Sequence, residues 1–486
     1  MIKNFKWLLL VSLTFVACNN SDEEIVVYNT SDGLVPTAGT ANFSKFVSLG
    51  NSLTAGYSDN ALFIDGQKVS YTNIMAQQFA TVGGGEFKIP FMADNIGGFK
   101  INGVPYSGPR LASSGGQAPA PVSGTPSTEI MTSIAAAGPY NNCGVPGAKS
   151  FHLLSPSYGS LAGISLGTAN PYYVRFAPNA TTSVLAYAAS QTPTFFSLWI
   201  GNNDVLGYAT SGGDGTNPIT PSAGVAGVGF DATYDALVNT LTSTGAKGVV
   251  ANIPYVNTVP FFTTVGNNPV PLVAAQVTAL NSAYAGYNGG LVAAKNLGLI
   301  TEAERLQRTI NFVVGNNAPV MIDEYLTDIT AISPALIKLR QTSSADYIVI
   351  SSNGTSIQTH LGAGNGTQFP LQDRWVLSKN EVAEVKTATD AYNAKIKSIA
   401  TAKGIAFVDT NALMTQIANG GISANGFTVT NAFVTGGGFS TDGVHPSPRG
   451  YALIANKFIE AINATYGSNL KGVNLGNYRI LFPKTL

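Results

Sequence analysis

Two short segments far apart in the chain contain the residue types needed for nucleophilic catalysis. Residues 50–53 (Gly-Asn-Ser-Leu) place a serine at a Gly-flanked turn directly after an apolar strand pattern. Residues 442–445 (Asp-Gly-Val-His) place a carboxylate three positions before one of only three histidines. A serine hydroxyl is a weak nucleophile unless an imidazole takes its proton, and a carboxylate orients that imidazole. We therefore expect acyl transfer with Ser52 as nucleophile, His445 as base and Asp442 as its partner.

The tetrahedral intermediate of acyl transfer also needs hydrogen-bond donors for its oxyanion. Two candidates lie in Gly-containing turns, namely the backbone amide of Gly147 and the side-chain amide of Asn203. The amide of Ser52, at a helix N-terminus, is a third. Simpler roles exist for each residue: Ser52 as a helix N-cap, Asn203 as a turn cap, Gly147 as a conformationally free residue and His445 as a satisfied loop histidine.

The elements that must position these residues are short, almost wholly apolar segments separated by helical patterns. We expect strands near 46–49, 194–200, 248–253, 310–322, 346–351 and 405–409, and helices near 70–79, 231–244, 271–297, 379–402 and 448–466. Such alternation indicates an open, mostly parallel sheet with helices on both faces. Ligands of these folds bind at the carboxyl ends of the strands. Ser52, Asn203 and His445 all lie in turns or loops that closely follow a predicted strand or open a helix.

Two further segments complete a family pattern. Residues 142–148 (Asn-Cys-Gly-Val-Pro-Gly-Ala) and 201–204 (Gly-Asn-Asn-Asp), with 50–53 and 442–445, resemble the four signature blocks of the SGNH (GDSL-type) hydrolases in that family's chain order. The resemblance implies an α/β fold, a flavodoxin-like three-layer sandwich with a mostly parallel sheet of about five strands.

The same resemblance implies the roles of the site residues. They are Ser52, Asp442 and His445 as catalytic residues, and Gly147, Asn203 and the Ser52 amide as oxyanion donors. Asn51 stands where the family usually has Asp. Because that residue is not a reacting group, we expect Asn51 to alter the packing of the turn more than the chemistry.

The chain divides into a leader, a tether and one large domain. We expect a lipoprotein signal peptide at 1–17, a flexible tether at 18–40, a hydrolase domain at 41–470 and a C-terminal extension at 471–486. Within the domain, two loop-rich insertions at about 57–140 and 260–375 are much longer than in compact members of the family.

The N-terminus predicts export and lipid anchoring. Lys3 and Lys6 precede an apolar stretch, 7–17, that is too short to span a bilayer. The stretch ends at Cys18 in a pattern that resembles a bacterial lipobox, although Phe15 replaces the usual Leu. We expect lipidation of Cys18 and an outer-membrane location, on the periplasmic or the cell-surface face. An ordinary secretory signal with a chance cysteine is the alternative.

The amino-acid composition bears on which partners and cofactors the protein is expected to bind. Charged residues make up only 11% of the chain, with 26 basic and 26 acidic side chains, which does not favour a nucleic-acid partner. The three His and two Cys are too scattered for a recognised metal site, so we expect no metal and no cofactor. With Cys18 acylated, Cys143 has no disulfide partner and is expected to be a small buried residue.

The predicted function is therefore a serine ester hydrolase that forms an acyl-enzyme. Its substrate is either a lipid or other acyl ester, or an O-acetyl group on a carbohydrate. The alternative is a surface lipoprotein that binds glycan or lipid on a hydrolase fold without turnover. Phe261 and Phe262 either line a substrate pocket or belong to the core, and His152 and His360 are expected to be structural or exposed.

Overall fold

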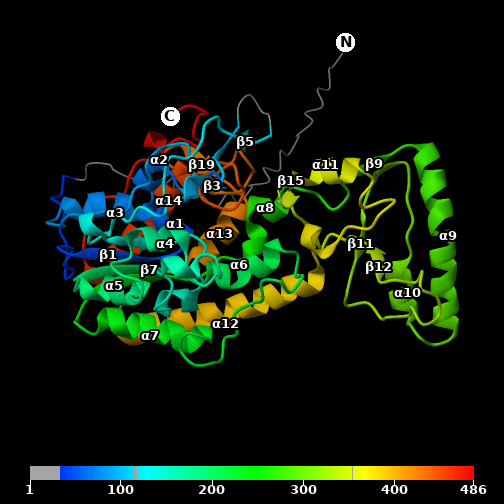
Figure 1. The fold of residues 1–486 in the computed structure, drawn as a ribbon, viewed down its shortest axis with the longest axis horizontal. Helices are drawn as coiled ribbons and strands as arrows, with labels where there is room; N and C mark the ends of the chain where they lie inside the picture. The colour runs from blue at the N-terminus through cyan, green and yellow to red at the C-terminus, as the bar shows by residue number, and fades with distance from the viewer. Residues whose placement is uncertain (1–32, 114–117, 353) are drawn as a thin grey trace, which may run out of the picture.

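A five-stranded, all-parallel sheet lies at the centre of the computed structural model, which describes residues 33–113, 118–352 and 354–486. Its strands are β1 (Phe46–Gly50), β6 (Asn142–Gly144), β7 (Phe195–Trp199), β8 (Lys247–Ala251) and β17 (Ala406–Val408). Their order across the sheet is β17-β8-β7-β1-β6 (Figure 1). Numbered along the chain, these strands run 2-1-3-4-5 from the β6 edge, the flavodoxin-like order, which confirms the predicted fold class.

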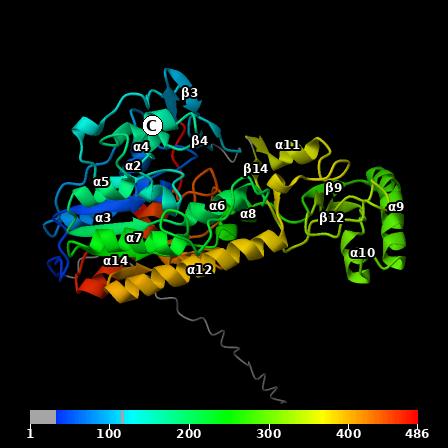
Figure 2. The same ribbon diagram turned by 60° about the horizontal axis from the view of Figure 1, so that its bottom comes forward.

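Helices cover both faces of the sheet. One face carries α3 (Tyr71–Ala80) and α14 (Pro448–Tyr466), and the other carries α5 (Val184–Ser190), α7 (Phe230–Thr242) and α12 (Lys379–Lys403) (Figures 1 and 2). Because both faces are covered, every residue of β1 and β7 is buried. This burial explains why these strands are continuous apolar runs rather than alternating ones.

The edge strand β6 is the core strand that the sequence pattern did not reveal. It has three residues, and only Cys143 is an apolar one. Cys143 is fully buried and pairs in register with Leu49 of β1, so the strand exists because of its neighbour rather than its own propensity. Two short helices, α6 (Asn202–Thr210) and α13 (Thr410–Ala418), were also not expected.

Local capping signals determine where the longest core helices begin. In α12, the Ser378 side chain accepts from Glu381 N while the Glu381 side chain accepts from Ser378 N, a capping box. In α14, Ser447 caps the first turn and Pro448 occupies its first position. Ser447, just before Pro448, is therefore extended, and the turn that precedes it contains His445.

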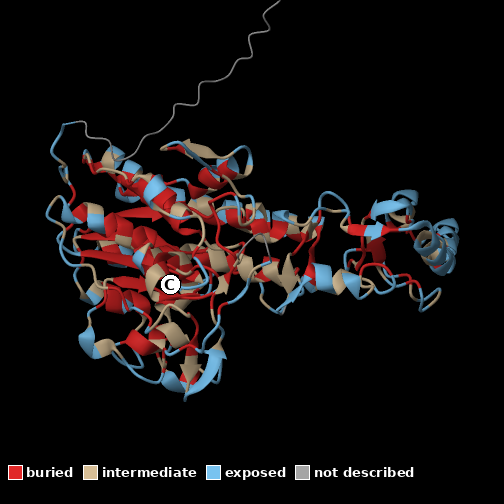
Figure 3. Ribbon diagram, turned by 90° about the horizontal axis from the view of Figure 1, so that it is seen from above, coloured by how far each residue is buried: buried red, intermediate tan, exposed pale blue. Residues whose placement is uncertain are grey.

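The second insertion builds a separate lobe. The distal lobe, defined here as residues 266–345, has its own buried cluster between Val270 and Leu339. It contains α9 (Ala274–Asn296), α10 (Glu302–Arg308), β9 (Val270–Leu272), β10 (Gly315–Asn317), β11 (Val320–Ile322) and β12 (Leu339–Gln341). It projects from the main body (Figures 1 and 2), and Figure 3 shows that much of α9 is exposed at the far end. Residues 347–377, by contrast, contribute to the main core.

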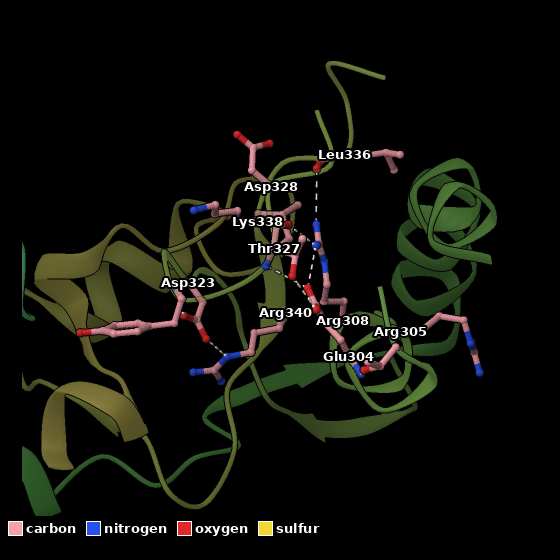
Figure 4. Close-up of polar contacts among 12 residues, drawn as sticks. Glu304, Arg305, Arg308, Asp323, Thr327, Asp328, Leu336, Lys338 and Arg340 are labelled. Atoms are coloured by element: carbon pink, nitrogen blue, oxygen red, sulfur yellow. Dashed lines mark hydrogen bonds and ion pairs between the residues drawn. The ribbon is translucent and has the colours of Figure 1, made fainter. Parts of the chain in front are cut away.

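Two buried arginines organise this lobe (Figure 4). Arg308 is fully buried and donates to the carbonyl oxygens of Thr327 (2.8 Å) and Ile337 (2.9 Å), with an ion pair to Glu304 at 3.2 Å. Arg340 forms ion pairs with Asp323 and Asp346. These contacts satisfy carbonyl oxygens that the loops of the lobe would otherwise bury without partners.

The first insertion and the C-terminal extension pack against each other. The first insertion contains α2 (Ile64–Lys68) and the pairs β2 (Phe99–Ile101) with β3 (Val104–Ser107) and β4 (Leu111–Ala112) with β5 (Ala120–Pro121). Phe63 packs edge-on against Phe482 at 4.9 Å, and Arg110 donates to Pro483 O at 2.6 Å. Within the described ranges, none of the helices combines the length and hydropathy that a bilayer span requires.

Candidate active site

The turn after β1 places Ser52 at the carboxyl end of the sheet. Gly50 ends the strand, and a Cβ at this position would collide with the Thr54 side chain and the Trp199 carbonyl. Ser52 opens the short helix α1 (Ser52–Ala55), and the Asn51 side chain caps it by accepting from Leu53 N at 3.0 Å.

The side chain at position 51 also links two of the motifs. Asn51 Nδ2 donates to Asn202 Oδ1 at 3.3 Å, which joins the Ser52 turn to the start of α6. An aspartate has no N–H for this bond. Asn51 therefore makes a contact to α6 that an aspartate at this position could not make in the same way.

Ser52, His445 and Asp442 lie in one continuous line of hydrogen bonds. Ser52 Oγ is 2.9 Å from His445 Nε2, and His445 Nδ1 is 2.9 Å from Asp442 Oδ2. Ser52 is 7% exposed and the His445 side chain 16% exposed, so the pair faces solvent only through a narrow opening. Residues almost the whole chain length apart are thus within contact distance.

Asp442 is held as a carboxylate by its surroundings. Its Oδ1 accepts from the backbone N–H groups of Val444 and His445, both at 2.8 Å, and its Oδ2 accepts from Asn60 N at 2.8 Å. Burial alone would raise the pKa of Asp442, but the charge of His445 and these hydrogen bonds outweigh it and lower the pKa to about 2. An ionised Asp442 favours the tautomer in which His445 Nδ1 is protonated, and Nε2 is then free to accept the Ser52 proton.

A tyrosine fixes the position of the imidazole ring. Tyr57 packs against His445 with ring centroids 4.6 Å apart, and its hydroxyl donates to Asn60 O at 2.6 Å. Tyr451 of α14 donates to Tyr57 O at 2.7 Å. Burial raises the pKa of Tyr57 well above its ordinary value, so this ring stays neutral beside the imidazole.

The expected oxyanion donors lie on the two loops that flank Ser52. Asn203 is in the first turn of α6, and its Nδ2 donates one N–H to Ala148 O at 2.9 Å, which leaves the second N–H available. Gly147 follows β6, is exposed, and has a φ of +81°, a conformation that favours glycine. Among the described residues, its amide has no hydrogen-bond partner.

Asp204 connects these two loops. Its carboxylate is fully buried and accepts from Ser150 N at 2.8 Å and Ser150 Oγ at 2.7 Å. Burial raises the pKa of Asp204 although the bonds to Ser150 act in the opposite direction. Asp204 therefore holds the Gly147 loop against α6.

An apolar cavity opens beside the hydroxyl of Ser52. Ser52, Asn203 and His445 line its mouth, while Gly147 and Asp442 are not part of the lining. Its walls come from the loop after β8, from α6, α13 and α14, and from the loop before His445. The apolar wall residues are Trp199, Leu206, Pro254, Val256, Val259, Leu413, Met414, Ile417, Phe439, Val444 and Ile454.

Phe261 and Phe262, which could have lined a substrate pocket, do not line this cavity. Phe262 is 1% exposed and belongs to the core, because the helix α8 (Pro260–Thr263) turns it inward. Phe261 acts through its backbone: its N–H donates to Gly443 O at 2.9 Å and so supports the loop that contains His445.

The other two histidines lie in aromatic contacts. His152 stacks on Tyr158 at 4.7 Å, and burial lowers its pKa to about 4. His360 stacks on Trp375 at 4.1 Å. In the part of the chain that the structure describes, no three His, Cys, Asp or Glu side chains are grouped as a metal ion would require. Cys18, the expected lipidation site, lies outside the described residues.

The site also contains residues that sequence reasoning missed. Asn60 supplies a backbone donor to Asp442, and Leu413, Met414 and Ile417 form one wall of the cavity. The helical spacing of the last three was a usable signal for α13. Nothing in the sequence around Asn60 indicated its contact, because it is made across 382 positions of the chain.

Comparison with known proteins gives one family match. Residues 311–458 match the model of the family described as GDSL-like lipase/acylhydrolase. The matched segment contains Asp442 and His445, whereas Ser52, Gly147 and Asn203 precede it. No curated protein matches the chain.

The match over residues 311–458 and the five-stranded parallel sheet together support membership in the SGNH (GDSL-type) hydrolase family. The matched family supports hydrolysis of esters as the general activity.

Proposed function

We propose that this protein is a serine ester hydrolase that forms an acyl-enzyme on Ser52. The observation that carries the proposal is the line of hydrogen bonds from Ser52 Oγ through His445 to Asp442, which ends at the mouth of an apolar cavity. A nucleophile, a base and a residue that orients the base are the groups that acyl transfer requires.

In the first half of the reaction, Ser52 Oγ attacks the ester carbonyl carbon while its proton moves to His445 Nε2. Asp442 remains ionised and stabilises the imidazolium. The carbonyl oxygen becomes an oxyanion that accepts from the amides of Ser52 and Gly147 and from Asn203 Nδ2. The intermediate then expels the alcohol, which takes the proton from Nε2 and leaves an ester on Ser52.

In the second half, water attacks the acyl carbon and gives its proton to His445 Nε2. The second intermediate breaks its bond to Ser52 Oγ, which recovers that proton, and the carboxylic acid leaves. The nearly buried Asp442 and the partly covered His445 ring favour this proton transfer, because electrostatic interactions are stronger where water is excluded.

The cavity supports an acyl group with a hydrocarbon chain in preference to acetyl. Leu, Val, Ile, Met, Phe and Trp side chains form much of its lining, and Ser52 is part of it. Each methylene that moves from water into such a site contributes about 0.8 kcal/mol, a gain that an acetyl group with its single methyl cannot match. We therefore favour a lipid or other acyl ester over an O-acetylated carbohydrate.

We also propose that the protein is exported and held at the outer membrane by a lipid on Cys18. What supports this is the basic, apolar and Ala-Cys pattern of residues 3–18. An anchored hydrolase with an apolar acyl site would meet its substrates at or near a membrane surface.

The replacement Ser52→Ala tests the enzymatic assignment. Wild type should hydrolyse p-nitrophenyl butyrate, and Ser52→Ala should lower kcat about 10⁴-fold or more, because the acyl-enzyme can no longer form. Ser243→Ala, which changes an exposed serine at the end of α7, is the matched control and should behave as wild type. Equal, slow rates for wild type and Ser52→Ala would instead favour a binding protein on a hydrolase fold.

A further inference from the structure

A tight turn of the first insertion contacts the loop that contains Asp442 and His445. Ser58 and Ala61 exchange backbone hydrogen bonds of 3.1 and 3.0 Å, and the two residues between them turn the chain. Asp59 and Asn60 have φ values of +53° and +63°, in the left-handed region that Asp and Asn adopt more readily than other side chains.

Ser58, Asp59 and Asn60 each form a hydrogen bond with the catalytic loop, defined as residues 440–446. The contacts are Ser58 Oγ to Pro446 O (3.1 Å), Asp59 N to Ser440 Oγ (3.0 Å) and Asn60 N to Asp442 Oδ2 (2.8 Å). The last bond reaches the carboxylate oxygen that also contacts His445 Nδ1. The position of the turn therefore determines how Asp442 meets the imidazole.

The Asp59 carboxylate locks the turn onto this loop. Its Oδ1 accepts from Thr441 N at 3.0 Å and from Thr441 Oγ1 at 2.7 Å, directly before Asp442. Asp59 is 1% exposed, and its Oδ2 has no hydrogen-bond partner among the described residues. Burying an ionised carboxylate without a full set of hydrogen bonds costs free energy, and a nearby opposite charge reduces that cost.

Arg110 supplies the opposite charge and connects the turn to the end of the chain. Its Nη1 lies 4.0 Å from Asp59 Oδ2, and Arg110 is also 1% exposed. Its Nε donates to Asn95 O at 3.0 Å and its Nη2 to Pro483 O at 2.6 Å and Lys484 O at 3.1 Å. The guanidinium is thus held by three carbonyl oxygens on two segments, at a fixed place beside Asp59.

We propose that Asp59, held beside Arg110, is a positioning residue for the catalytic pair Asp442–His445. It acts through Thr441 and through the Asn60 amide, and it does not touch the substrate. The proposal rests on the proposed ester hydrolysis and adds to it a role for Asp59 and Arg110 of the first insertion and, through Arg110, for the C-terminal extension.

The test measures kcat and KM of Asp59→Ala and Asp59→Asn with p-nitrophenyl butyrate, per active site titrated with a fluorophosphonate. Asp59→Ala removes the acceptor for Thr441, so we expect kcat per titrated site to fall about 10- to 100-fold with KM within about 2-fold, the size of effect that a small misplacement produces. Asp59→Asn retains an oxygen for Thr441 and should recover most of the rate. A merely structural role would reduce the number of titrated sites and leave kcat per site unchanged.

A control variant and a second pair of variants complete the test. Asp235→Asn, on α7, removes an ion pair with Lys395 of α12 and should leave both parameters unchanged. If Asp59→Ala does not fold, the variants Thr441→Val and Thr441→Ser provide the test. Thr441→Val should lower kcat per titrated site, and Thr441→Ser should leave it unchanged. Wild-type kcat per site in Asp59→Ala, or in Thr441→Val, overturns the proposal. Absence of ester hydrolysis in the wild type refutes the proposed function itself.

Discussion

The properties of the candidate catalytic residues come from their immediate neighbours. Asp442 and Asp59 are both carboxylates with little exposure, and both bond to the same loop. Asp442 accepts three backbone N–H groups and the imidazole, which lower its pKa. For Asp59, burial and the nearby charge of Asp442 outweigh the bonds from Thr441 and the charge of Arg110, and its pKa rises to about 6. The surroundings therefore stabilise the ionised form of Asp442 and disfavour the ionised form of Asp59.

The opposite shifts predict how stability depends on pH. Asp59 has a folded pKa near 6, above its ordinary value of 3.8, so its ionised form destabilises the fold above pH 6 and this penalty disappears as the pH falls toward 4. Wild type should therefore gain stability relative to Asp59→Asn by about 2 to 3 kcal/mol between pH 7 and pH 4. Urea denaturation of both proteins at pH 7, 5 and 4 measures this difference, and a constant difference would contradict it.

The stability measurement should stop near pH 4, because protonation of Asp442 destabilises the fold whereas protonation of Asp59 stabilises it. Its folded pKa of about 2 lies below the ordinary value, so it contributes stability above the pKa of the unfolded chain. That contribution is lost as the pH falls through the folded pKa. Below pH 4 the two effects would overlap.

Among the helices, α13 has the most direct consequence for specificity. Leu413, Met414 and Ile417 on one side of it form a wall of the cavity. We expect wild type to prefer octanoyl to acetyl esters. Met414→Trp should lower the ratio of kcat/KM for octanoyl over acetyl esters about tenfold or more, because the indole fills space that the chain needs. Met131→Trp, at an exposed methionine outside the cavity, is the control. A ratio unaffected by Met414→Trp would argue against an acyl site here.

The helix α10 offers a matched comparison of a buried and a surface ion pair. Arg308 is fully buried beside Glu304 (Figure 4), whereas Arg305 pairs with the exposed Glu302. Arg308→Met removes the side-chain donor to Thr327 O and Ile337 O and the buried ion pair with Glu304, which should cost on the order of 3 kcal/mol in the distal lobe. Arg305→Met should change stability by less than about 0.5 kcal/mol.

Hydrogen exchange over residues 300–340 measures this difference. Arg308→Met should show faster exchange in the distal lobe, and its hydrolysis of a soluble ester should equal that of wild type, because the lobe's cluster is separate from the main core. Equal exchange in the two variants would mean that Arg308 does not hold the lobe together.

In the whole molecule, the two insertions have different relations to the site. The first insertion supplies the turn at 58–61 and, through Arg110, contacts the C-terminal extension. The distal lobe projects from the body beside the long helix α12, and α9 is exposed at its far end (Figures 1 and 3). The first insertion therefore bonds directly to the candidate site, whereas none of the residues that line the cavity belongs to the distal lobe.

The proposed anchor predicts where the intact protein is found. Expressed in a bacterium, the wild-type chain should incorporate labelled palmitate and fractionate with the outer membrane, and Cys18→Ser should do neither. Both forms should hydrolyse soluble esters equally, since neither Cys18 nor its lipid is among the proposed reacting groups. Labelling of Cys18→Ser, or a wild type free in the periplasm, would contradict the anchor.

The sheet and the four motif segments were predictable because their signals are local. A buried parallel strand is an apolar run whatever surrounds it, and β1, β7, β8 and β17 could be read in this way. A Gly-flanked turn after such a strand places its next residue at the carboxyl edge, which is why Ser52 and Asn203 could be assigned to one site. The catalytic roles of these residues remain predictions that the measured distances now make testable.

Amino-acid order alone was enough to establish the fold class and to single out Ser52, Asp442 and His445, since periodicity and turn chemistry act over a few neighbouring residues. The strand β6, the apolar wall on α13 and the contact of Asn60 with Asp442 emerged only in the folded chain. Each of them depends on a partner tens to hundreds of positions away, and no short-range pattern encodes which distant segment a residue will meet.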